Sequence, residues 1–89
     1  MNVDNLGTAA AEIAMQSASD YVRKHNLIVR DYGAAIECLR SWCKIMLPQA
    51  LADAKAAADC GMFAVASETF RASMVLAGIE AAKEFGSVA

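Results

Sequence analysis

The chain has 89 residues, of which 57% are apolar, and its eight basic and ten acidic residues give a net charge of −2. This length fits a single domain, 1–89, in which we expect residues 1–7 to be flexible. The charge balance excludes the basic excess of a dedicated nucleic-acid binder.

The sequence contains no signal that predicts export or membrane insertion. Its first residues lack the basic stretch of a secretory signal, and the longest uncharged stretches near the C-terminus, 60–67 and 72–79, have eight residues each. A bilayer span needs about twenty. The three cysteines form no Cys-x-x-Cys pair and no disulfide framework. We therefore expect a cytoplasmic protein with no membrane partner, metal or cofactor.

Helical periodicity dominates the chain and begins with a predicted helix over 8–24. Ala10, Ala14 and Ala18 recur at the spacing of one helical face. Asn26 can supply the left-handed residue that ends such a helix. The β-favouring run that follows, Leu27–Val29, is too short to predict more than a connector.

A second helix is predicted over 31–46, because Asp31 is a good N-cap and an apolar stripe follows it. Pro48 is expected to end or kink this helix, since proline has no N–H to donate, and it also fits the first turn of a new helix. We therefore predict a short third helix over 49–59, which Gly61 ends with a positive φ angle.

The last predicted helix, 62–85, is apolar on nearly every side, with no charged residue between Arg71 and Glu80. A helix that is apolar all round is a buried helix. Only three other helices are available to cover it, so we predict a compact all-α bundle of four helices with short loops that forms a homo-oligomer. The candidate residues of the self-association interface are Phe70, Met74, Leu76, Ala77 and Ile79.

Five residues have the spacing of a helical hairpin with small residues at the helix crossing, a glycine at the turn and an aromatic residue beyond it: Ala54, Gly61, Ala66, Phe70 and Ser73. Over this segment the sequence resembles one tetratricopeptide repeat. The resemblance implies a helical hairpin and no ligand-binding residues. No second copy occurs, and the proline that follows the second helix in this family is absent.

Five residues are candidate contacts to a partner or ligand. Arg23, Lys24 and Arg30 belong to a local concentration of basic residues that could hold a phosphate or an acidic partner. Tyr32 and Trp42 lie ten residues apart, nearly in phase on one helical stripe, and could anchor a partner or line a pocket. The alternatives are a solvated helix end for the first set and an aromatic core stripe for the second.

No pattern in the sequence predicts catalysis. The single histidine, His25, stands beside two cations at a predicted helix end, where it complements the helix dipole. A phosphate-binding glycine loop, a nucleophile elbow and paired catalytic carboxylates are all absent from the sequence. We therefore predict that the protein is not an enzyme.

The leading functional hypothesis is a non-enzymatic helical module for protein–protein interaction. Small helical proteins of this kind are common among bacterial accessory proteins and phage-encoded inhibitors of host proteins. The alternative is a helical bundle that binds a small ligand between helices or subunits. A third hypothesis is a thiol-based regulatory protein that uses Cys60, whose reactivity depends on which helix end lies beside it.

Overall fold

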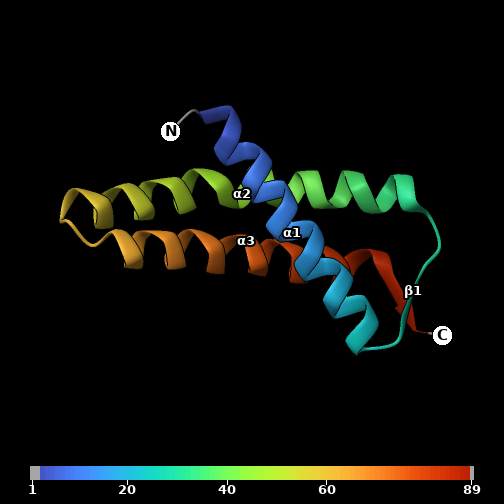
Figure 1. The fold of residues 1–89 in the computed structure, drawn as a ribbon. Coiled ribbons are helices and arrows are strands. Elements are labelled where there is room, and N and C mark those ends of the chain that lie inside the picture. The colour runs from blue at the N-terminus through green and yellow to red at the C-terminus, as the bar shows by residue number, and fades with distance from the viewer. Residues whose placement is uncertain (1–2, 89) are drawn as a thin grey trace.

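The computed structural model describes residues 3–88, with side chains from residue 7 onward, and these residues form three helices and one pair of short strands (Figure 1). The elements in chain order are α1 (Val3–Lys24), β1 (Leu27–Val29), α2 (Tyr32–Asp59), α3 (Phe63–Phe85) and β2 (Gly86–Val88). α2 and α3 form a long antiparallel hairpin, and α1 crosses one face of it. The molecule is therefore flat and elongated, with extents of 46 × 22 × 16 Å. The prediction of an all-α fold is confirmed.

The prediction of four helices is wrong, because 31–46 and 49–59 belong to one continuous helix, α2, with Pro48 inside it. Proline removes one helical hydrogen bond, here to the carbonyl of Lys44 four residues earlier. Both residues are on the exposed surface of α2. The residues around the proline pack into the core with α3 and keep the helix continuous: Met46, Leu47 and Ala50.

The predicted helix ends are confirmed where the sequence supplies a specific capping residue. The carboxylate of Asp31 accepts a hydrogen bond from the backbone N–H of Ala34 at 3.1 Å and so caps α2. Asn26 has a φ of 54° after α1, and Gly61 has a φ of 76° in the turn between α2 and α3. These three residues fix the direction in which the chain enters or leaves a helix.

The N-terminal helix is longer than the sequence predicts. α1 begins at Val3 rather than at Thr8, whereas its end at Lys24 is the predicted one. Residues 1–2 lie outside the part of the chain that the structure describes.

The two strands close the end of the molecule opposite the hairpin turn (Figure 1). They pair antiparallel, with Leu27 opposite Val88 and Val29 opposite Gly86. Gly86 permits this close approach, because a Cβ there would lie 2.7 Å from Cδ1 of Leu27 and 2.8 Å from the carbonyl oxygen of Ala82. The predicted connector is therefore a strand, and its partner is distant in the sequence.

The core lies where the three helices meet, and alanine is its most frequent residue. Small side chains let the helices approach closely, and Met74 is the largest side chain that is fully buried among the described residues. The hairpin implied by the tetratricopeptide resemblance is present, with Gly61 at its turn. The buried apolar residues are Ala10, Ala14, Ala18, Ala35, Ala50, Ala66, Phe70, Met74, Ala77, Ala81 and Ala82.

α1 and α3 come into backbone contact at Gly78. A Cβ on this glycine would lie 2.2 Å from the carbonyl oxygen of Ala14 and 2.9 Å from Cβ of Ser17. The hydroxyl of Ser17 donates a hydrogen bond to the carbonyl oxygen of Val75 at 2.6 Å, which adds a polar link between the same two helices. No residue larger than glycine fits at this crossing without moving α1.

Replacing Gly78 with alanine is expected to lower the free energy of unfolding by about 2–3 kcal/mol, because the added methyl group pushes α1 away from α3. The matched control is Gly7→Ala in α1, where a Cβ would meet nothing within 4 Å. Alanine there is expected to stabilise the protein by up to about 1 kcal/mol through its helix propensity. Urea unfolding followed by circular dichroism measures both changes. Equal effects at the two positions would contradict the close contact at Gly78.

Candidate functional site

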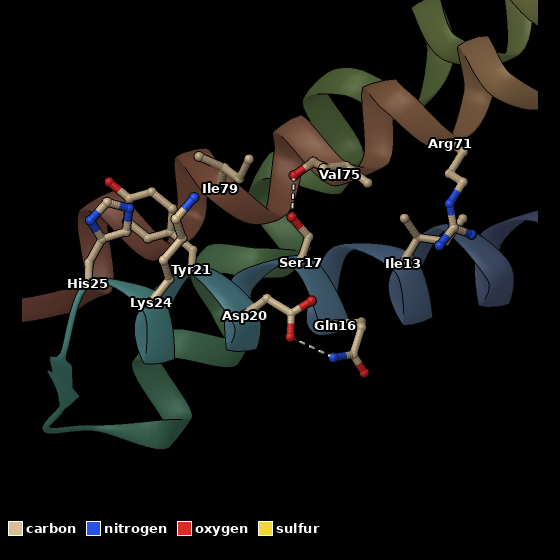
Figure 2. Close-up of a pocket in the computed structure, with 10 residues that line it drawn as sticks. All are labelled: Ile13, Gln16, Ser17, Asp20, Tyr21, Lys24, His25, Arg71, Val75 and Ile79. Atoms are coloured by element: carbon tan, nitrogen blue, oxygen red, sulfur yellow. Dashed lines mark hydrogen bonds between the residues drawn. The ribbon is translucent and has the colours of Figure 1, made fainter.

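The crossing of α1 over the hairpin leaves a hollow on each side of α1. The hollow toward α3, which we name the α1–α3 cleft, has a volume of about 410 Å³ (Figure 2). The hollow toward α2, the α1–α2 groove, consists of two cavities of about 360 and 430 Å³ that share Met15, Ile36 and Leu39 in their walls. α1 packs much more closely on α3 than on α2. The packing of α1 against α2 is therefore the looser of the two.

The α1–α3 cleft carries positive charge at its two ends. Figure 2 shows Arg71 at the end near Ile13, and Lys24 and His25 at the other end. Ile13 and Lys24 are eleven residues apart on α1, which is about 16 Å. One small anion cannot contact both ends at once.

The middle of this cleft contains a carboxylate. Asp20 accepts hydrogen bonds from Gln16, at 2.9 Å, and from Arg23. His25 stacks on Tyr21 with ring centroids 4.2 Å apart, and its backbone N–H donates to the carbonyl of Tyr21 as α1 ends. These side chains therefore interact mainly with one another, and the cleft does not form a single anion site.

The predicted basic contacts are not gathered into one site. Arg23 pairs with Asp20 on the exposed surface of α1, whereas Lys24 lines the α1–α3 cleft. Arg30 is exposed in the loop before α2 and lines neither the cleft nor the groove. These three basic residues are close in the sequence but do not line a common pocket.

The two predicted aromatic contacts also separate. Tyr32 is 74% exposed and lines the α1–α2 groove. Trp42 is half-buried, and its Nε1 donates a hydrogen bond to Glu84 of α3 at 3.1 Å. The expectation that these two residues are nearly in phase is wrong, because ten residues leave an offset of about 80° around an α-helix. The two rings therefore face different neighbours.

A polar cluster on the hairpin was not predicted, because its members lie on different helices. Oε2 of Glu84 accepts hydrogen bonds from Sγ of Cys38 at 3.0 Å and from Trp42. Both bonds lower the pKa of the Glu84 carboxyl. The pKa of Cys38 is raised to about 11, mainly by burial and to a smaller extent by the hydrogen bond and the charge of Glu84. Burial also raises the pKa of Cys43, whereas Cys60 is exposed in the hairpin turn.

Alkylation is expected to distinguish Cys38 from an ordinary cysteine. At pH 8 a thiol with a pKa of about 11 has about one hundredth of the thiolate of a thiol with the usual value of 9.0, so iodoacetamide should modify Cys38 about a hundredfold more slowly than free cysteine. Glu84→Gln removes the carboxylate and is expected to shift the Cys38 profile to lower pH. Peptide mass spectrometry across a pH series measures this shift, and an unchanged profile would contradict the contact.

The α1–α2 groove is lined mainly by apolar side chains from both helices. Its α2 wall runs from Tyr32 to Leu47, sixteen residues that span about 22 Å of helix. The groove residues on α1 are Gly7, Ala10, Ala11, Met15, Ala18, Ser19 and Val22; those on α2 are Tyr32, Ala35, Ile36, Leu39, Arg40, Cys43, Lys44 and Leu47; Val29 and Phe85 also line it. Met15 and Ile36 are 56% and 47% exposed, so both walls present large apolar side chains to solvent.

Arg40 and Lys44 are the charged residues of this lining, and both belong to α2. Arg40 forms an exposed ion pair with Glu37 at 3.2 Å. Lys44 takes part in none of the ion pairs found among residues 7–88. The α2 wall is therefore apolar with a positive edge, and the α1 wall carries no charge among the residues from 7 onward that line it.

The predicted self-association residues fall into two groups. Phe70, Met74 and Ala77 are buried within the chain's own fold, the first two in a cluster with Ala10 of α1 and Ala50 of α2, so this fold does not present them to a second copy. Leu76 remains 46% exposed, and Ile79 is half-buried in the α1–α3 cleft. The long α2 supplies much of the cover for α3 that the sequence analysis assigned to a partner.

The described residues contain no group of three or more His, Cys, Asp or Glu side chains that could hold a metal ion. No helix in that part of the chain is long and apolar enough to cross a membrane. No protein-family model, curated protein or solved structure matches the chain.

Proposed function

We propose that this protein is a non-enzymatic interaction module that binds a helix of another protein in the α1–α2 groove. The observation that supports the proposal is an apolar groove about 22 Å long between two helices, with Met15, Ile36 and Tyr32 exposed along it. Exposed apolar surface rimmed by polar residues is typical of a protein interaction site.

The dimensions of the groove suit a helix of about fifteen residues. Helix-in-groove recognition uses anchor side chains spaced three to four residues apart, which enter neighbouring pockets. The two adjoining cavities of the groove provide such a pair of pockets, joined at Met15, Ile36 and Leu39. A bound helix would thus lie between α1 and α2 and complete a four-helix arrangement.

Photo-crosslinking at two matched positions of α2 tests this function. Ile36 and Ile45 are both exposed isoleucines, but only Ile36 lines the groove. In the cells that make the protein, a benzophenone amino acid at position 36 is expected to crosslink to a partner protein that position 45 does not capture. Adding Met15→Glu in the opposite wall should abolish the crosslink, because a carboxylate replaces an apolar contact.

The same partner captured equally from both positions would contradict binding in the groove. A crosslink at position 36 to a small molecule alone would contradict the interaction role and favour the ligand-binding hypothesis. Circular dichroism of each variant establishes that the helices remain intact.

A further inference from the structure

We infer that the helix bound in the α1–α2 groove is acidic, with carboxylates along the edge that meets α2. This inference rests on the proposed function and adds the chemistry of the partner. It follows from the distribution of charge along the two walls of the groove.

The positive charge of the groove lies on one edge. Arg40 and Lys44 are four residues apart on α2, so they lie one turn apart on the same face of that helix. Among the residues of α1 whose side chains the structure describes, those that face this edge, which include Gly7, Ala11 and Met15, carry no charge. This edge is opposite in sign to the net charge of the chain, which is −2.

Both cations are available to a partner. Lys44 takes part in none of the ion pairs found among residues 7–88. Arg40 pairs with Glu37, but both side chains are mostly exposed, at 69% and 72%, and such surface pairs contribute little to stability. A carboxylate of the partner can therefore join or replace Glu37 without a large cost.

The polarity of the walls also sets the orientation of the partner's side chains. Apolar anchors of the bound helix would enter the two cavities, where Met15, Ile36 and Leu39 meet. The flank beside the anchors would face Arg40 and Lys44. A basic flank would meet like charges at this position, and complementary charge is the general means by which an interface excludes such partners.

Two synthetic amphipathic peptides of about sixteen residues test the inference. Both have the same leucine stripe, and one has glutamate on the flank where the other has lysine. The fluorescently labelled peptides are titrated with the full protein, and anisotropy gives each Kd. The acidic peptide is expected to bind about tenfold or more tightly than the basic one, and this difference should shrink at high salt.

Two charge reversals on α2 provide matched variants. Lys44→Glu lies on the edge of the groove, whereas Lys55→Glu lies on the same helix at an exposed position that does not line the groove. Both change the net charge equally. Lys44→Glu is expected to weaken the binding of the acidic peptide by roughly five- to tenfold and to strengthen the binding of the basic peptide. Lys55→Glu should change the Kd of either peptide by no more than about twofold.

The outcomes test the charge of the partner separately from the binding of a helix in the groove. Equal binding of the two peptides to the unmodified protein, or equal effects of the two variants, would overturn the inference that the partner helix is acidic. The groove would still be a binding site for a helix. Binding of neither peptide would contradict the proposed function as well. A stable dimer of the free protein that loses its affinity for itself in Met15→Glu would overturn the inference by identifying a second copy as the occupant.

Discussion

Backbone contact between α1 and α3 determines the layout of the molecule. At Gly78 the two helices approach so closely that a single methyl group would collide with the carbonyl of Ala14, and the hydrogen bond from Ser17 to Val75 fixes the same crossing. Because α1 is drawn onto α3, its other side stands away from α2. The α1–α2 groove is the direct consequence of this asymmetric packing.

The parts of the fold that depend on local chemistry could be predicted from the sequence. The side chain of Asp31 caps the start of α2, and the backbone of Gly61 adopts the positive φ angle of the hairpin turn. The sequence predicts both. The continuity of α2 through Pro48 could not be predicted, because it depends on packing against α3. Strand pairing between Leu27 and Val88 likewise joins residues too far apart for periodicity to connect.

The candidate site was harder to predict than the fold, because it depends on the angle between helices. Of the five predicted contacts, only Tyr32 lines the α1–α2 groove, and Lys24 lines the opposite cleft. The basic residues are neighbours only in the sequence, whereas the groove joins residues of α1 and α2 that are distant from one another along the chain. The one available signal was Met15, a large apolar residue beside the predicted apolar stripe of α1 rather than within it.

Methyl NMR of the methionines tests the account most directly. Met15 and Met62 are similarly exposed, at 56% and 51%, but only Met15 lines the α1–α2 groove, whereas Met62 lies at the hairpin turn. A soluble paramagnetic agent is expected to broaden both methyl signals in the free protein, and the acidic peptide is expected to shift and protect the Met15 signal alone. Equal protection of both methyls, or protection of Met62 alone, would contradict this expectation.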